Sequence, residues 1–284
     1  MKRWFTTLAV VLCCSAALRA DITIVQTTTV EGGMAAMAAN AGANMSPKMT
    51  TRVKGMKNRT DMDAGPISFS AIVDLATKQM IVLRADQKTA TIVSAPSAPT
   101  TTTSATGATT TTPPITGPSI EATVKPTGKS QVIDGLKCEE YSFTTTMDMS
   151  AMSGGRQMPP EAAAMMQGMK IIMAGSMWVT KDAPGAAEYL AFQKAMAAGD
   201  LAGAAAGMTM NIPGMDKMMK ALSSLNGLAY LTEMTMNVEG EGQMADMMRQ
   251  MGPMKITTKV NSVTTDALSD DLFKVPEGYT IVKQ

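Results

Sequence analysis

Methionine is the residue type whose number and spacing in this chain most suggest chemistry. The 284 residues include 30 methionines and no histidine. Thioether sulfurs prefer soft ions, so one interpretation is a site for Cu(I) or Ag(I). A second is a pliable apolar surface for lipid or peptide, and a third is methionine as an ordinary core filler. The methionines gather in four groups: Met147, Met149 and Met152; Met165, Met166 and Met169; Met208, Met210 and Met215; Met244, Met247, Met248, Met251 and Met254.

The distribution of these groups favours the core-filler interpretation over a metal site. They are spread over predicted strands and helices alike, and the absence of histidine removes every mixed His/Met site. A tight site made of methionine alone needs about three thioethers held in fixed positions, whereas these groups lie on segments that we expect to be mobile. We therefore predict no cofactor and no tightly bound metal, Cu(I) included.

Other residue types give no catalytic set either. Without histidine the chain lacks the commonest general base and the usual serine or cysteine triads. Cys138 is the only cysteine after position 14, so we expect no internal disulfide and a buried, inert thiol. The pairs Asp61/Asp63 and Asp270/Asp271 are predicted in turns, where aspartate is favoured for backbone reasons. We predict that the protein is not an enzyme.

The first 20 residues have the pattern of a secretory signal. Lys2 and Arg3 precede a short apolar core, which is too short to span a bilayer, and small residues follow. We expect cleavage after Ala20 and export to the periplasm or beyond, with no transmembrane segment in the mature chain. Lipidation at Cys13 or Cys14 is the weaker alternative, because no small residue directly precedes them. The net charge of +1 gives no electrostatic case for nucleic acid.

The chain is organised around residues 226–282, where apolar side chains alternate with polar ones. Two such runs, beginning near Leu228 and Met254, predict an antiparallel hairpin. One face is expected to point toward helices and any cavity, and we take it as the candidate ligand-binding face. It comprises Tyr230, Met234, Met236, Met254 and Ile256. The opposite face is expected to carry Glu233, Thr235, Lys255 and Lys259.

Short strands with polar turns also fill residues 21–93 and 119–180, which is typical of an antiparallel meander. Residues 170–180 are apolar on both faces and predict a strand covered on both sides. Helices are predicted over 184–198 and 215–225 from their apolar spacing, and a short helix over 158–167, which has prolines near its start.

Residues 94–118 are rich in threonine and proline and have almost no large apolar side chains. They cannot offset the entropy of ordering. We interpret them as a disordered insertion within a single domain, 21–284, rather than as a linker or a wall-spanning stalk. Replacing 96–118 by a short Gly/Ser link is accordingly expected to leave the fold intact.

Three passages carry a resemblance: the turn 74–80 (DLATKQM), the strand end 176–180 (SMWVT) and the ending 273–279 (FKVPEGY). They resemble an uncharacterised family of bacterial periplasmic domains that is similar to the lipoprotein-carrier superfamily of LolA, LppX and RseB types. The resemblance implies an incomplete, half-open β-barrel wrapped over a few short helices, with an apolar cavity for acyl chains and no catalytic residues.

We therefore expect an α+β fold with a curved antiparallel sheet. The expected function is a non-enzymatic carrier in the cell envelope for an apolar ligand, either a lipid or the acyl chain of a lipoprotein. Two alternatives stay open. One is a methionine-rich soft-metal protein, and the other is a structural or stress-sensing module that binds another protein.

Overall fold

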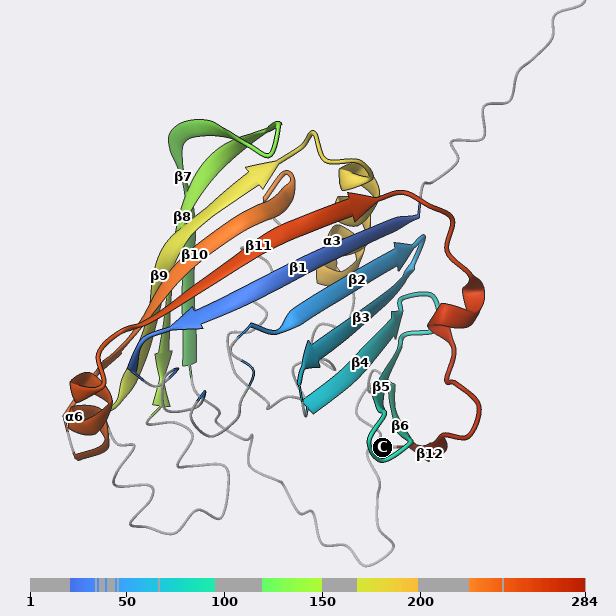
Figure 1. The fold of residues 1–284 in the computed structure, drawn as a ribbon, viewed down its shortest axis with the longest axis horizontal. Helices are drawn as coiled ribbons and strands as arrows, with labels where there is room; N and C mark the ends of the chain where they lie inside the picture. Colours follow the sequence, from blue (N-terminus) through green and yellow to red (C-terminus); the bar gives the residue numbers. More distant parts are fainter. Residues whose placement is uncertain are drawn as a thin grey trace, which may run out of the picture.

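The computed structural model describes residues 21–33, 35, 39, 44, 46–65, 67–94, 119–149, 168–198, 225–241 and 243–283. The predictions for the signal sequence, for the cysteines within it, for residues 95–118 and for a helix at 158–167 fall outside these residues. The same holds for all but the last residue of the helix predicted at 215–225. Within the described residues, strands form one large sheet, and two α-helices lie against it or at its end (Figure 1).

The sheet has twelve strands. They are β1 (Ile22–Glu31), β2 (Lys48–Lys54), β3 (Lys57–Ala64), β4 (Ile67–Asp74), β5 (Gln79–Arg84), β6 (Thr89–Ser94), β7 (Ser119–Ile133), β8 (Leu136–Asp148), β9 (Lys170–Thr180), β10 (Leu228–Glu239), β11 (Met254–Thr264) and β12 (Thr280–Lys283). The helices are α3 (Ala186–Ala198), α6 (Gln243–Gln250) and the single 3₁₀ turn η2 (Asp270–Phe273).

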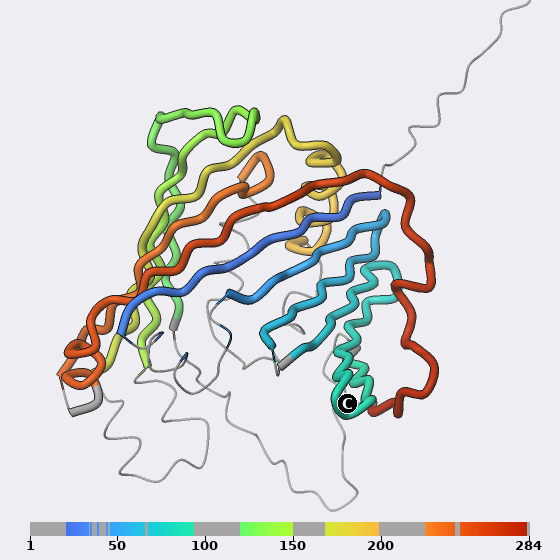
Figure 2. Tube along the Cα trace, in the orientation of Figure 1, coloured from blue at the N-terminus to red at the C-terminus, as the bar shows by residue number. Residues whose placement is uncertain are grey.

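The strand order is β12-β6-β5-β4-β3-β2-β1-β11-β10-β9-β8-β7, so β12 and β7 form the two edges. Every neighbouring pair is antiparallel except β12 with β6, which is parallel. The first described strand, β1, lies between β2 and β11, and Figure 2 shows it beside a strand from near the other end of the chain. The sheet is therefore assembled from two halves that meet where β1 pairs with β11.

The main core lies between one face of the sheet and α3. Ile22 and Ile24 are fully buried there, and Phe192 of α3 packs against the same cluster. Burial of one such side chain is worth about 1.5–3 kcal/mol. Helix α3 agrees with the helix predicted over 184–198, and Tyr189 and Met196 pack against this core as its apolar spacing requires.

A second core lies on the opposite face, where the C-terminal segment between β11 and β12 crosses the sheet. Phe273 packs against Ile72, Leu83 and Ala90. The neighbouring Val73 belongs to the main core, so β4 is covered on both faces. Phe273 marks the point where the C-terminal segment is anchored by apolar packing.

Polar contacts hold the same C-terminal segment in place. The Leu268 backbone N–H donates to Asp21 (2.7 Å), and the Leu268 carbonyl accepts from Lys54 Nζ (2.6 Å). Arg59 Nη1 donates to the Leu272 carbonyl at 3.0 Å. These bonds satisfy backbone groups of a segment that has no strand partner of its own before β12.

Arg59 also belongs to a network with Arg52, Asp61 and Ser70, here called the arginine–aspartate network. The Asp61 carboxylate accepts from Arg59 Nε at 2.8 Å and from the Ser70 hydroxyl at 2.6 Å, and it pairs with Arg52. Burial by itself would raise the pKa of Asp61. Hydrogen bonds from Ser70 and Arg59, with the two guanidinium charges, outweigh that effect and lower the pKa.

The expected α+β class is wrong. The chain is largely all-β: its described part has twelve strands in one sheet and only two α-helices. The parallel pairing of β12 with β6 also departs from the expected purely antiparallel sheet. The prediction missed strands whose residues are polar.

Strand β3 is the clearest of these missed strands. Its sequence, KNRTDMDA, reads as a charged turn, and Asp61 and Asp63 were accordingly predicted in turns. Both lie instead on a strand paired on each side, with β2 and with β4. The charged side chains are accommodated because Asp61 finds cationic and hydroxyl partners on neighbouring strands. Asp270 and Asp271 begin the 3₁₀ turn η2.

Several strand predictions are confirmed. Strands β10 and β11 pair antiparallel as the predicted hairpin, with α6 inserted between them. Strand β9 is covered on both sides, because Trp178 packs against the main core whereas Met177 and Val179 form a third cluster with Leu225. Cys138 is fully buried, and its burial raises the pKa of the thiol. Across the described part of the chain, no helix combines the length and hydropathy required to cross a membrane.

The strand order changes what is expected of residues 95–118. They connect β6, one strand from an edge, to β7, the opposite edge, and nine strands lie between these two. At about 4.8 Å for each strand step, the separation along the sheet is about 48 Å. Figure 1 shows β6 and β7 on opposite sides of the molecule. A link of four residues reaches only about 14 Å, so the expectation that a short link preserves the fold has to be withdrawn.

Candidate methionine-lined site

The candidate site lies on the hairpin β10–β11. Pairing of Met234 with Ile256 and of Met236 with Met254 puts these four side chains on one face. They are partly buried, and that face continues into the main core, which contains Tyr230 and Val260. The five residues expected to share a face therefore do so. Whether they bind a ligand is a separate question.

Tyr230 differs from the other four residues because its polar end is already engaged. Its ring is 6% exposed and its hydroxyl donates to an Asp134 carboxylate oxygen at 3.2 Å. Lys259 Nζ lies 3.0 Å from the same carboxylate. Burial and the Asp134 charge raise the pKa of Tyr230. Tyr230 thus ties the hairpin to the turn between β7 and β8, and it is not a free wall of a cavity.

The opposite face of the hairpin carries the polar residues that were expected there. Thr235 is paired with Lys255, and Lys255 Nζ lies 4.0 Å from the Glu233 carboxylate across the strands. Exposed pairs of this kind contribute little to stability. Their value here is in fixing the register, because a shift by one residue would turn these charges toward the core.

A pocket of about 210 Å³ lies at the end of the hairpin where α6 folds over it. Two of the predicted residues, Met236 and Met254, line it together with Met248 of α6. The remaining walls are Asn237, Val238, Arg249, Gly252 and Pro253. Met234, Ile256 and Tyr230 share the sheet face but do not line this pocket. The sequence prediction therefore identified two of its residues and missed Met248 and Arg249.

One glycine and one arginine position α6 over the hairpin. Gly240 has φ of +125°, and a Cβ there would lie 2.4 Å from the Gly168 carbonyl oxygen. Only glycine permits this close approach before the helix. Arg249 Nη1 donates to the Gly240 carbonyl at 2.6 Å, and Nη2 pairs with Asp246. The Arg249 charge at the pocket is therefore already balanced by a carboxylate.

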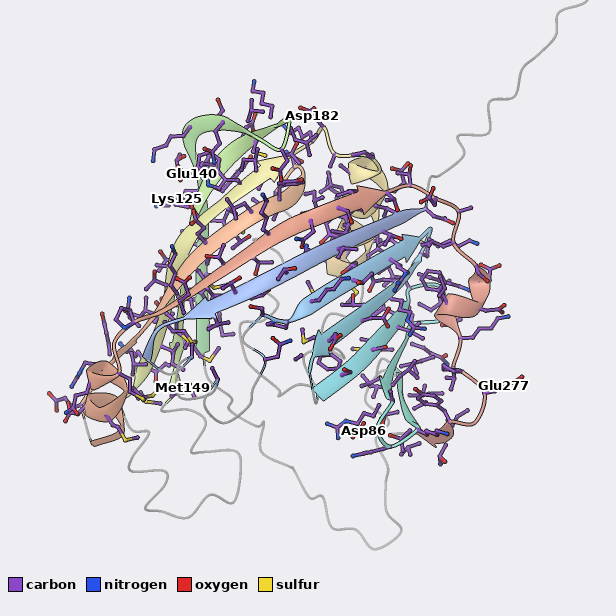
Figure 3. The ribbon with its side chains drawn as sticks, in the orientation of Figure 1. Asp86, Lys125, Glu140, Met149, Asp182 and Glu277 are labelled. Atoms are coloured by element: carbon purple, nitrogen blue, oxygen red, sulfur yellow. The ribbon has the colours of Figure 1, made fainter. Side chains whose placement is uncertain are left out.

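Three methionines form a row across the sheet beside this pocket, here called the methionine row. Met236 on β10 is directly opposite Met254 on β11 and also directly opposite Met173 on β9. All three are partly exposed. Figure 3 shows sulfur atoms at this end of the sheet, near α6 and the labelled Met149. Residues 173, 236 and 254 fall in no single sequence cluster, so spacing along the chain does not reveal the row.

Other chemistry is sparse in the described residues. No three side chains of histidine, cysteine, aspartate or glutamate come together there in a way that would hold a metal ion. Two further hollows, of about 160 and 230 Å³, lie beside α3 at Gly55 and Met56 and beside the β7–β8 pair at Lys129 and Glu140. Glu140 is engaged there by Thr127 at 2.7 Å and Lys129 at 3.2 Å. The methionine-lined pocket is the one that matches the sequence prediction.

Comparisons with known proteins add little to this picture. No protein-family model matches the chain, and no curated protein matches it. A crystal structure of an uncharacterized conserved protein from Thermus thermophilus is similar to it over 94% of this chain and 92% of that one, with a TM-score of 0.41 and 6% sequence identity. A similarity this weak supports no argument about function.

Proposed function

We propose that the protein is a non-enzymatic carrier that binds an apolar ligand, a lipid or the acyl chain of a lipoprotein, at the β10–α6–β11 end of the sheet. The observation that supports this most directly is the pocket lined by Met236, Met248 and Met254. Methionine side chains are flexible and polarizable, so they adapt to apolar ligands of varied shape. The absence of histidine from the sequence supports a binding role over a catalytic one.

The size of the pocket limits what it can hold. At about 210 Å³ it is smaller than the roughly 300–1,000 Å³ of ordinary small-molecule sites. We infer that it takes one end of an acyl chain, whose remainder would follow the apolar face toward Met234 and Ile256. This proposal places the carrier in the cell envelope, which rests on the signal-like sequence of residues 1–20.

The test is native mass spectrometry of the exported protein, with lipid quantified in organic extracts of the same preparation. Met236→Trp should fill the pocket, leave the fold intact and reduce bound lipid. Thr235→Trp is the matched control, because the neighbouring residue on the same strand faces the other way. The proposal fails if wild-type protein carries no lipid, or if Met236→Trp retains as much lipid as Thr235→Trp.

A further inference from the structure

The methionine row brings thioethers together in a way that no single sequence cluster does. Directly opposed residues on neighbouring antiparallel strands have Cβ atoms about 4.5–5.5 Å apart. Met236 has such a neighbour on each side, Met173 and Met254. Methionine has three rotatable side-chain bonds. Sulfur atoms from adjacent positions in this row are therefore able to approach a common point without any movement of the backbone.

A fourth thioether reaches the same place from a different element. Met248 of α6 lines the pocket together with Met236 and Met254, and α6 is held over the hairpin by Arg249 and Gly240. The pocket lining includes no carboxylate, and its one charged residue, Arg249, is paired with Asp246. Hard cations such as Mg²⁺ and Ca²⁺ require oxygen ligands and would find few here. Neutral sulfur donors in an apolar pocket suit a soft monovalent ion.

We propose that Met236, Met248 and Met254, with Met173 beside them, form a thioether site for Cu(I) or Ag(I). This reverses the sequence prediction of no tight site. That prediction rested on methionine clusters lying on mobile segments, whereas three of these four residues come from paired strands. Partial exposure of all four side chains gives an ion access from solvent.

The site is separate in chemistry from the apolar-ligand function proposed above, although the two share a pocket. Leucine has nearly the volume and hydrophobicity of methionine but no sulfur, so Met→Leu changes are well tolerated in cores. Replacing Met236 and Met254 by leucine should weaken metal binding, because two sulfur donors are lost, whereas the lipid test above uses wild-type protein and different variants. Each property can therefore fail without the other.

The experiment uses Ag(I), which is soft and does not require a reductant, and the mature chain carrying ¹³C-methyl methionine. The methyl signals of Met173, Met236, Met248 and Met254, assigned by single Met→Leu changes, should shift with the first equivalent of Ag(I). The Met236→Leu/Met254→Leu variant should bind Ag(I) at least about tenfold more weakly than wild type, because even the loss of a group that only orients a metal ligand typically costs about 10- to 100-fold in affinity.

The matched control is Met49→Leu/Met62→Leu, because Met49 and Met62 are also directly opposed on neighbouring strands but lack a third methionine partner in their row. It should bind Ag(I) as wild type does, and thermal melts should show both variants folded. Equal Ag(I) affinity in the two double variants would overturn the proposal. So would a first equivalent of Ag(I) that leaves the four methyl signals of the wild-type protein unmoved.

Discussion

The methionine-lined pocket and the arginine–aspartate network are two partly exposed regions of one sheet that are built in opposite ways. At the pocket, Met236, Met248 and Met254 meet with adaptable apolar side chains and without direct hydrogen bonds to one another. In the network, Asp61 has fixed partners in Arg52, Arg59 and Ser70, and Arg59 also binds the Leu272 carbonyl.

The contrast separates a region suited to binding from one suited to holding the fold. Satisfied polar groups specify a single arrangement, because leaving any one of them unpaired costs free energy. Methionines impose no such demand, so their region can change its packing when a ligand or ion enters. The C-terminal segment lies over the arginine–aspartate network, and α6 lies over the methionine-lined pocket.

The largest expected effect concerns the connection between the two ends of the sheet. Replacing residues 96–118 by a four-residue Gly/Ser link should abolish cooperative folding, since the link cannot reach from β6 to β7. A Gly/Ser replacement of equal length is the control and should fold. Thermal melts followed by circular dichroism measure both. A cooperative melt of the short-link protein would mean that the strand order is wrong.

The next effect tests the anchoring of the C-terminal segment. Phe273→Ala should lower the free energy of unfolding by about 3–5 kcal/mol, because it empties a buried aromatic position among Ile72, Leu83 and Ala90. Urea titration gives this value. Met236→Leu, in the methionine-lined pocket, should change the free energy of unfolding by less than about 1.5 kcal/mol. Similar losses in the two variants would erase the distinction between the two regions.

A smaller effect is expected from placing a carboxylate on either face of β10. Met236→Asp should cost about 1–3 kcal/mol, since it places a charge among methionines where Arg249 is already engaged. Thr235→Asp should cost almost nothing, because Lys255 lies directly opposite and offers an ion pair. Thermal or urea melts of both variants measure the two losses of stability. Equal destabilisation would mean that both faces of β10 are covered.

The smallest effect concerns acid sensitivity in the network. Asp61→Asn should cost about 1–2 kcal/mol at neutral pH, through loss of charged hydrogen bonds from Arg59 and Ser70. The folded-state pKa of Asp61 is lowered below its ordinary value of 3.8. The stabilisation is therefore complete above pH values near 3.8 and is lost as the pH falls through the folded-state pKa.

The difference in unfolding free energy between wild type and Asp61→Asn should accordingly shrink as the pH is lowered below about 4. Met236→Leu should show no such pH dependence, because it removes no titratable group. A constant difference between wild type and Asp61→Asn from neutral pH down to strong acid would mean that the carboxylate charge contributes nothing to the network.

The sequence by itself predicted the local features of this protein. Period-two alternation identified strands β10 and β11 and the residues on each of their faces, because side chains on a strand point alternately to its two sides. The spacing of Tyr189, Phe192 and Met196 predicted α3, and the apolar run of β9 predicted a strand covered on both faces. Each of these signals is contained within about 15 consecutive residues, the range over which helix and strand periodicity can be read.

Only the tertiary structure decided which strands distant in the sequence become neighbours. Periodicity does not specify a partner, so nothing local indicated that β1 pairs with β11 or that β12 joins β6 in parallel. The polar strand β3 became recognisable only through the partners that Asp61 finds on β2 and β4. The methionine row exists for the same reason: backbone hydrogen bonding between β9, β10 and β11 places Met173, Met236 and Met254 side by side.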